Sequence, residues 1–408
     1  MKRVVVTGVG AITALGNDWG TISQKFRDGQ TAVRRMEEWS DISGLRTLLG
    51  APVTDFEKPE HYSRKQTRSM GRGSLMSTRA TEVALTQAGL LDDPIIQDGR
   101  MGIAYGSCSG SSKAVADFAG LLLQRTTRNI TATTYVEMMS HTCAVNTGLF
   151  FGLKGRVIPT ASACTSGSQG VGYAYEAIKY GHQSLMVAGG AEELCPTQVA
   201  VFDTLFATSQ KNDTPQLTPQ PFDRDRDGLV IGEGACSLIL EELEHAQARG
   251  AKIYAEVVGY ATNSDGRHIT SPTADTMEVV MRQALANAEL DPAAIGYVNA
   301  HGTATEQGDI AETNATSSVF GPEMAISSLK SYYGHSLGAC GAIEAWLTIE
   351  MMNSDWYAGT ANLNNVDERC GELNYLRLAG GNLHNEYVMS NNFAFGGINT
   401  SLIFKRWA

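Results

Sequence analysis

The sequence predicts an α/β protein with a large buried core. Hydrophobic residues make up 43% of the 408 residues and charged residues only 18%, while glycine occurs 43 times. This balance is typical of a compact enzyme with tight turns and close backbone packing. Apolar, strand-like runs alternate with amphipathic stretches, which is the pattern of helices that cover a sheet. A chain of this length exceeds one ordinary core, so we expect two domains or one duplicated fold.

The predicted strands are short apolar runs, and helical periodicity lies between several of them. In chain order the strands cover residues 3–7, 101–105, 157–159, 185–188, 235–241, 255–260, 297–299, 325–327 and 401–404, and the clearest helices cover 77–89, 167–180 and 274–288. A further helical run ends at Arg249 and Gly250, where a new strand begins. We therefore divide the chain into an N-terminal half, residues 1–250, and a C-terminal half, residues 251–408, packed as one body.

The composition argues against several classes of protein. The net charge of −11 has the opposite sign to that of a general nucleic-acid binder, so an acidic partner would need a local basic patch. The apolar N-terminal run is interrupted by Thr7, Gly8 and Gly10, and no other run is long enough to cross a membrane, so we expect no export signal and no membrane insertion. The seven cysteines show no C-x-x-C spacing, which indicates neither a disulfide framework nor a zinc site and suits a cytoplasmic protein.

The most informative stretch surrounds Cys164, in P-T-A-S-A-C-T-S-G-S-Q-G at residues 159–170. A predicted strand ends before it and a glycine-rich helical segment follows. A thiol at such a turn lies near a helix N-terminus, whose dipole and free N–H groups favour thiolate over thiol. A single buried cysteine is most often a small core residue. The small neighbours of Cys164 leave room for a substrate, so here we favour a nucleophile.

Two histidines have comparable settings. His301 lies in N-A-H-G-T-A-T and His335 in K-S-Y-Y-G-H-S-L-G-A, and each follows a short predicted strand among glycine and small polar residues. Active-site groups of α/β folds gather at such strand ends. Either one alone could be an ordinary hydrogen-bonded loop histidine. Together with Cys164 they suggest a three-residue site.

Six motifs span the whole chain: T-A-S-A-C-T-S-G, G-G-A-E-E (189–193), P-F-D-R-D-R-D-G-L-V-I-G-E-G-A (221–235), N-A-H-G-T-A-T-E-Q-G-D (299–309), L-K-S-Y-Y-G-H-S-L-G-A-C-G-A-I-E (329–344) and N-N-F-A-F-G-G-I-N (391–399). In their sequence and order they resemble the motifs of the elongating β-ketoacyl-[acyl carrier protein] synthases with a Cys-His-His site. This branch includes bacterial synthases I and II and the ketosynthases of type II polyketide systems. The resemblance implies a dimer with a thiolase-like fold, layered α-β-α-β-α and built from two similar halves.

The resemblance also implies the reaction and its central residues. Cys164 would take an acyl group from the phosphopantetheine thioester of an acyl carrier protein. Malonyl-carrier protein would then lose carbon dioxide, and the resulting carbanion would attack the acyl-cysteine, which lengthens the chain by two carbons. His301 and His335 would promote decarboxylation and stabilise the negative charge. Lys330 would orient this cluster electrostatically, with Glu344 as a structural carboxylate nearby. No separate cofactor is expected.

Further residues match supporting positions of the family. The backbone N–H groups of Cys164 and Phe395 would form an oxyanion hole, and the Phe395 side chain would gate the acyl pocket. Thr303 and Thr305 would hydrogen-bond the pantetheine arm, with Asp309 in support.

Other expectations concern the acyl chain and bound ions. Phe202 and Ser109 would line the acyl pocket, and Ser109 stands where synthase II types carry a bulkier aliphatic residue. Ala394 replaces a usual glycine of the family, and Phe206 replaces a common docking arginine. Together with the small Ser109, these differences favour polyketide or polyene chains over the substrates of housekeeping fatty-acid synthesis. A buried monovalent-cation site, seen in some members of the family, would use Asn299, Glu344, Ser390 and Asn391.

A local excess of positive charge lies at residues 64–79, where no acidic residue occurs. Lys65, Arg68 and Arg72 have the i, i+3, i+7 spacing of one helical face, although neighbouring glycines weaken that helix. Such a face is usually only solvated. Because carrier proteins are acidic and family members dock them here, we expect these residues to bind the carrier.

Three alternatives remain to be separated. A thiolase-like acyltransferase that uses coenzyme A shares the fold but employs a second cysteine rather than a histidine pair. A starter enzyme of the synthase III type would carry asparagine at the position of His335. A chain-length-factor-like subunit would lack the active-site cysteine, so Cys164 marks this chain as the active partner, whether in a homodimer or in a heterodimer with such a subunit.

Overall fold

The computed structural model describes residues 1–408 as an α/β fold around one continuous sheet. The sheet has eleven strands in the order β13-β11-β10-β15-β16-β9-β1-β8-β6-β4-β5. The strands of the N-terminal half are β1 (Val4–Thr13), β4 (Met101–Gly106), β5 (Val157–Thr160), β6 (Leu185–Glu192) and β8 (Gly234–Glu242). Those of the C-terminal half are β9 (Ala255–Ser264), β10 (Ile295–Asn299), β11 (Ala325–Ser327), β13 (Asn374–Tyr375), β15 (Tyr387–Ala394) and β16 (Ile398–Arg406).

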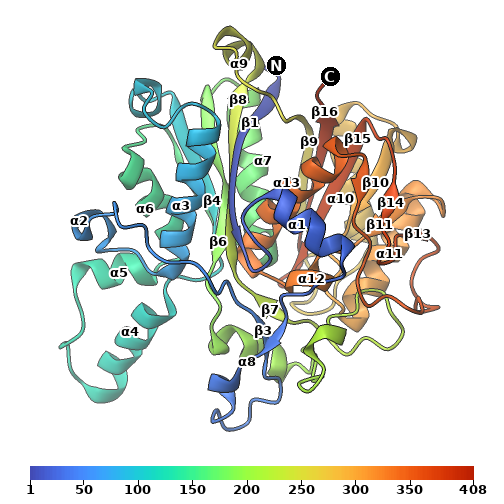
Figure 1. Ribbon diagram of the computed structural model, residues 1–408, viewed down its shortest axis with the longest axis horizontal. Coiled ribbons are helices and arrows are strands. Elements are labelled where there is room, and N and C mark those ends of the chain that lie inside the picture. Colours follow the sequence, from blue (N-terminus) through green and yellow to red (C-terminus); the bar gives the residue numbers. More distant parts are fainter.

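Helices form three layers around the two parts of the sheet (Figure 1). Helices α3 (Arg72–Gln87) and α6 (Thr142–Phe151) cover the outer face of the first half, and α10 (Ala274–Ala288) and α11 (Glu306–Phe320) cover that of the second. Helices α7 (Ser166–Lys179) and α13 (Cys340–Asn353) pack on each other in the middle layer, and each contacts strands of both halves. This is the predicted α-β-α-β-α order.

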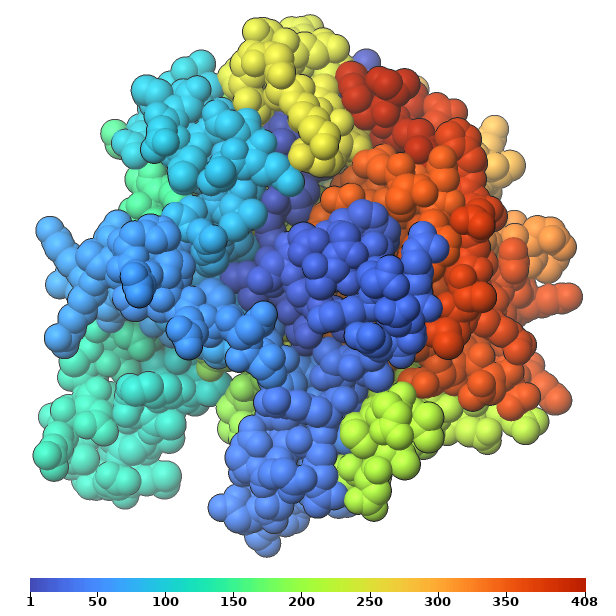
Figure 2. All heavy atoms as spheres, viewed as in Figure 1, coloured from blue at the N-terminus to red at the C-terminus, as the bar shows by residue number.

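The remaining elements are short or peripheral. Helix α1 (Trp19–Arg27) lies across the face between the two halves (Figure 2), where Phe26 packs on Tyr332 of α12 (Lys330–Tyr333). Helices α4 (Ser112–Gln124) and α5 (Ala132–Met138) project from the body. The others are α2 (Arg64–Thr67), α8 (Pro196–Thr204), α9 (Leu243–Ala248), β2 (Arg34–Arg35), β3 (Leu49–Ala51), β7 (Ile231–Gly232), β12 (Trp356–Tyr357) and β14 (Gly381–Asn382). None of the helices is sufficiently long and apolar to span a bilayer.

Strand β1 joins the halves, because it pairs with β8 on one side and with β9 on the other. It is longer than the predicted strand at 3–7 and continues through two glycines. A Cβ atom at Gly8 would lie 2.3 Å from the carbonyl oxygen of Ala84, and one at Gly10 would lie 2.1 Å from that of Ala80. These glycines therefore let α3 lie directly on the strand. Since one sheet runs through both halves, the division at residue 250 stays a prediction.

Candidate active site

Cys164 lies in a tight turn between β5 and α7. It belongs to a single 3₁₀ turn, Ala163–Thr165, and the preceding Ala163 adopts a left-handed backbone with φ 52°. The hydroxyl of Ser166 donates to the carbonyl of Ala163 at 2.7 Å and accepts the N–H of Ser162 at 2.9 Å, which closes the turn. A strained backbone at such a position is typical of a functional site. The turn places the Cys164 side chain at the N-terminal end of α7, as predicted.

The two histidines come from the C-terminal half and are held through their backbones. The N–H groups of His301 and Gly302 both donate to the carboxylate of Glu312 on α11, at 2.7 Å each. The N–H of His335 donates to the carbonyl of Val230 at 2.7 Å, and its carbonyl accepts the N–H of Gly232 at 2.9 Å. The loops that carry the imidazoles are therefore anchored independently of any substrate.

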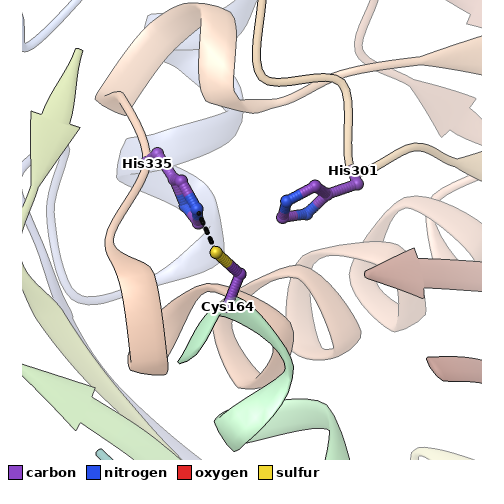
Figure 3. Close-up of side chains that lie close together, drawn as sticks. All are labelled: Cys164, His301 and His335. Atoms are coloured by element: carbon purple, nitrogen blue, oxygen red, sulfur yellow. Dashed lines mark hydrogen bonds between the residues drawn. The ribbon is translucent and has the colours of Figure 1, made fainter. Parts of the chain in front are cut away.

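The three predicted side chains converge (Figure 3). The Nε2 atom of His335 lies 2.9 Å from the Sγ atom of Cys164. The rings of His301 and His335 are 5.1 Å apart between centroids and nearly perpendicular, at 88°. All three residues are buried. Residues separated by up to 171 positions in the sequence thus form one cluster.

Burial controls the protonation of this cluster. It lowers the pKa of both histidines well below the ordinary value, and the positive charge of Lys330 lowers them further. Burial also raises the pKa of the Cys164 thiol to about 11, although the backbone N–H of Phe395 and the charge of Lys330 oppose this. The prediction that the helix N-terminus makes Cys164 a thiolate is therefore wrong, because desolvation outweighs the N–H groups and the dipole. At neutral pH the site holds a thiol beside two neutral imidazoles.

Behind the histidines lies a buried ion pair. The ammonium of Lys330 contacts the carboxylate of Glu344, and both side chains are almost completely buried. Burial disfavours the lysine charge, but Glu344 outweighs this effect and raises the pKa of Lys330, so the lysine is charged. The second oxygen of Glu344 accepts the amide N–H of Asn392 at 2.7 Å.

Two polar residues of the site were not predicted. The side-chain amide of Asn392, on β15, lies 3.4 Å from Nδ1 of His301 and links that ring to Glu344. Glu312 holds the backbone of the His301 loop, as described above. Asn392 falls within the N-N-F-A-F-G-G-I-N motif, so the motif could have identified it as a residue of the site. Glu312 lies in an unremarkable helical stretch, and nothing in the local sequence distinguishes it.

A cavity of about 420 Å³ connects Cys164 to the surface. Its lining includes both histidines, Thr303, Thr305, Phe202 and Phe395. The hydroxyls of Thr303 and Thr305 lie 2.9 Å apart, and the rings of Phe202 and Phe395 pack edge to face at 5.8 Å. Asp309 lies below this wall, where it accepts N–H groups of Phe222 at 2.8 Å and Ala304 at 3.2 Å.

Ser109 does not line this cavity. It lies on a separate, much smaller cavity, and its hydroxyl donates to the buried carboxylate of Glu192 at 3.1 Å. The expectation that Ser109 opens the acyl pocket is therefore not supported. The sequence match identified the position, but not the hydrogen bonds that turn the side chain toward Glu192.

The three predicted docking residues do not share one helical face. Lys65 lies in α2, Arg68 caps its end, and Arg72 begins α3. The guanidinium of Arg72 forms a two-pronged ion pair with Glu233 at 2.9 Å and donates to the carbonyl of Val53 at 2.7 Å. The single-helix prediction is wrong because the chain turns at residues 68–71. Lys65 and Arg68 are still accessible, whereas Arg72 is occupied within the fold.

Two sets of side chains bring potential metal ligands within 4.8 Å of one another: Cys164, His301 and His335, and His301, Cys340 and Glu344. In the second set Glu344 already neutralises Lys330, so a further cation there would meet a positive charge. At the predicted monovalent-cation site the amide N–H of Asn299 donates to the Ser390 hydroxyl at 3.3 Å, and the buried Oδ1 of Asn299 has no protein partner. Asn391 instead accepts the Ser401 hydroxyl at 2.6 Å. The unpaired Oδ1 atom of Asn299 is a suitable ligand for a cation. The monovalent-cation site stays a prediction.

Comparisons with known proteins agree with this geometry. The family model for the N-terminal domain of β-ketoacyl synthases matches residues 1–246, and that for the C-terminal domain matches residues 254–364. The chain is 37% identical to the 3-oxoacyl-[acyl-carrier-protein] synthase 2 of Vibrio cholerae over 99% of both chains. The crystal structure of a β-ketoacyl synthase from Burkholderia phymatum matches with a TM-score of 0.99 and 58% identity over 100% of both chains.

A more distant structure, the ishigamide ketosynthase/chain length factor, matches with a TM-score of 0.91 and 28% identity over 100% of both chains. The fold and the family predicted from the motifs are thereby confirmed. The chain belongs to the β-ketoacyl synthases, and it is a condensing acyltransferase of the 3-oxoacyl-[acyl-carrier-protein] synthase type.

Proposed function

We propose that Cys164 carries the growing acyl chain and that His335 and His301 serve different steps of the condensation. The observation that supports this most directly is the 2.9 Å separation between Cys164 Sγ and His335 Nε2, at a cavity that also contains His301. A thiol with a pKa of about 11 needs a base at neutral pH, and a neutral imidazole at hydrogen-bond distance supplies one.

In the first step, Cys164 attacks the thioester carbonyl of an acyl carrier protein while His335 takes its proton. The tetrahedral oxyanion lies against the backbone N–H groups of Cys164 and Phe395, both of which also stabilise the thiolate. When the carbon–sulfur bond of the donor breaks, the pantetheine sulfur takes the proton from His335 and leaves as a thiol, so His335 is neutral again. The acyl group is then a thioester of Cys164.

In the second step, malonyl-carrier protein occupies the same cavity, and its carboxylate leaves as carbon dioxide. The bonding electrons remain on the α-carbon and the thioester oxygen as an enolate. That carbon attacks the acyl-Cys164 carbonyl, and cleavage of the cysteine thioester releases a β-ketoacyl-carrier protein that is two carbons longer. The Cys164 sulfur leaves as thiolate and recovers one proton.

His301 is suited to bind the enolate oxygen. The amide of Asn392 faces Nδ1 of His301, so the ring hydrogen lies on Nε2. Because burial and the charge of Lys330 keep the His301 ring neutral, it donates this hydrogen without exchanging a proton. His335 is neutral again at this stage, because its proton has left with pantetheine. Lys330 stabilises both negative species through its charge.

The cavity also fits the long arm of a carrier protein. Thr303 and Thr305 supply hydroxyls along the wall for the amides of pantetheine, and Phe202 with Phe395 supplies apolar surface for the acyl chain. The rim includes Phe206, which is 78% exposed, and Ile269, which is 62% exposed. We propose that the carrier protein rests on this apolar rim and contacts Lys65 and Arg68 with its acidic residues. We also place the reaction in the cytoplasm, where the seven cysteines, all unpaired, stay reduced.

A dimer is supported by unpaired surface at one edge. Strand β5 ends the sheet with one free side, and its Val157 is 46% exposed. Leu122 and Leu123 on the projecting α4 are 69% and 83% exposed. Open strand edges and clustered apolar side chains favour association. We propose that a partner of the same fold binds at this edge. The partner is either a second copy of this chain or a chain-length-factor-like subunit, as in the ishigamide ketosynthase/chain length factor.

A thiolase mechanism would need a second reactive cysteine, and the cavity lining contains Cys164 alone among the cysteines. Cys340 is the cysteine whose thiol contacts the Cys164 backbone, at 3.3 Å from its carbonyl, but it is buried and does not line the cavity. The deciding experiment mixes the protein with hexanoyl- and malonyl-carrier protein, or with hexanoyl- and acetyl-coenzyme A. A two-carbon-longer product from the first mixture alone, with release of carbon dioxide, supports the proposal. Condensation of the coenzyme A pair without decarboxylation would contradict it.

A further inference from the structure

Glu192, the last residue of β6, buries a carboxylate that the reaction above does not use. The residue is 1% exposed and makes no ion pair. Each hydrogen bond that its carboxylate makes is accepted from a neutral donor. Its Oε2 accepts the N–H groups of Cys108 at 2.7 Å and Gly338 at 3.2 Å, and its Oε1 accepts the hydroxyl of Ser109 at 3.1 Å. A buried carboxylate without a cation is costly, so it is retained only where its bonds fulfil a need.

The two N–H groups come from loops that flank the reacting pair. Cys108 follows β4, whereas Gly338 lies in the 3₁₀ turn Leu337–Ala339, three residues after His335. The turn is tightly packed: a Cβ atom at Gly338 would lie 2.7 Å from Glu192 Oε2, and one at Gly167, three residues after Cys164, would lie 2.9 Å from the Gly338 carbonyl. Glu192 therefore joins the loop of His335 to the surroundings of Cys164.

This turn needs an anchor. Leu337 has a φ of 46°, a left-handed conformation that a leucine adopts only when its surroundings hold it. On the other side, the backbone of His335 is fixed by Val230 and Gly232. Between Ser336 and Ala339, Glu192 supplies the charged acceptor, and bonds from N–H groups to a carboxylate are stronger than neutral ones.

We propose that Glu192 is a positioning residue that holds the 336–339 turn, and through it the imidazole of His335, against Cys164. The proposal rests on the Cys164–His335 pair of the proposed function. The strength of the anchor depends on whether Glu192 is ionised, since a protonated carboxyl loses the charge that draws in both N–H groups. Loss of the anchor lengthens or misaligns the contact between His335 and Cys164.

The ionisation of Glu192 falls in the neutral range. Burial raises its pKa to about 7, and the bonds from Cys108, Gly338 and Ser109 limit the rise. The titratable groups that face it are the thiols of Cys108 and Cys143, and burial raises the pKa of both, that of Cys143 to about 12. Neither thiol titrates near neutrality. The adjacent Glu193 is directed elsewhere, to the N–H of Ser112 at 2.6 Å.

The test compares Glu192→Gln with Glu193→Gln, a neighbouring buried carboxylate that accepts the backbone N–H of Ser112 but not that of Cys108 or Gly338. The rate at which iodoacetamide alkylates Cys164 is followed by mass spectrometry of the Cys164 peptide between pH 6 and 8.5. We expect E192Q to remain folded and to react at least about 10-fold more slowly. Because the Cys164 thiol has a pKa of about 11, its alkylation rate increases steadily with pH in every variant. The wild-type rate should rise more steeply than this near pH 7, whereas E192Q should show the steady increase alone. E193Q should keep the wild-type rate and profile.

A wild-type rate and profile for E192Q, or an equal loss in E193Q, would overturn the assignment. Should E192Q fail to fold, Ser109→Ala removes one donor, which raises the Glu192 pKa, so the rise in rate must move to higher pH; an unmoved profile then counts against the role. Alkylation requires neither carrier protein nor condensation. A failure of the synthase reaction therefore leaves this result interpretable, and a failure here leaves the proposed reaction standing.

Discussion

The Nε2 atom of His335 contacts the Cys164 thiol at 2.9 Å, whereas His301 has no hydrogen bond to that thiol and instead meets Asn392. The two histidines should therefore differ in function. His335→Ala should slow acyl transfer to Cys164, because the thiol loses its base. His301→Ala should leave that transfer largely intact but reduce decarboxylative condensation about 10²- to 10³-fold, the usual effect of one positioned donor.

Single-turnover acylation and malonyl decarboxylation, measured separately, check this division. Asn392→Ala serves as a milder comparison, since it removes only the partner of His301. Equal losses of both half-reactions in H301A and H335A would show that the histidines act as one unit, and unimpaired condensation in both variants would remove them from the mechanism.

The pH dependence of acylation should reveal neutral histidines. Burial holds the pKa of His301 and His335 well below 6.5, so both are neutral across the neutral range and gain a proton only in more acidic solution. Because the folded pKa lies below the unfolded one, protonation also favours unfolding, and stability falls as the pH drops below about 6.5. We expect the acid limb of acylation in the E192Q H301A double variant, in which Glu192 cannot titrate and His335 is the remaining histidine of the pair, to lie well below pH 6.5. An acid limb at or above pH 6.5 in this variant would contradict the buried, neutral assignment.

The Lys330–Glu344 ion pair should matter for stability as well as for rate. Removal of either partner leaves a buried charge uncompensated, which typically costs about 3–5 kcal/mol. We expect Lys330→Met and Glu344→Leu each to show a loss of that order in urea unfolding. The double variant should lose less than the sum of the two. Strict additivity would mean that the two charges do not depend on each other.

The docking proposal predicts a difference between neighbouring basic residues. Lys65→Glu with Arg68→Glu should raise KM for acyl-carrier protein without changing KM for a short acyl-pantetheine, and added salt should reproduce the effect on the unmodified protein. Arg72→Ala should instead lower the melting temperature, because Arg72 holds Glu233 within the fold. An unchanged KM for carrier protein in the double variant would leave Lys65 and Arg68 as an ordinary solvated surface.

Residue patterns and motifs predicted the architecture and the central trio of the site, but not the environment of each group. Period and composition located most strands, since an apolar run is visible locally. Strand β15 was missed because its buried centre consists of Ser390, Asn391 and Asn392, polar residues that only the assembled sheet satisfies. The same long-range packing reversed the expected pKa of Cys164, since the local turn suggests a thiolate and burial by the second half raises the pKa.

Side-chain direction was the other limit. Ser109 and Arg72 were chosen by position in the sequence, yet Glu192 at the end of β6 and Glu233 between β7 and β8 bind them from far along the chain. Glu192 itself belongs to a recognised motif, but its two-loop contact appears only in three dimensions. Sequence patterns therefore could not predict the role of a residue whose hydrogen-bond partner lies far away in the sequence.

The central claim is that Cys164 carries the acyl group, and intact-protein and peptide mass spectrometry test it most directly. The protein is incubated with hexanoyl-carrier protein alone, with Cys164→Ala and Cys340→Ala as variants. We expect one hexanoyl group on the peptide that contains Cys164, unchanged labelling in C340A, and none in C164A, followed by loss of the label when malonyl-carrier protein is added. A hexanoyl group on another cysteine, or elongation by C164A, would contradict the account.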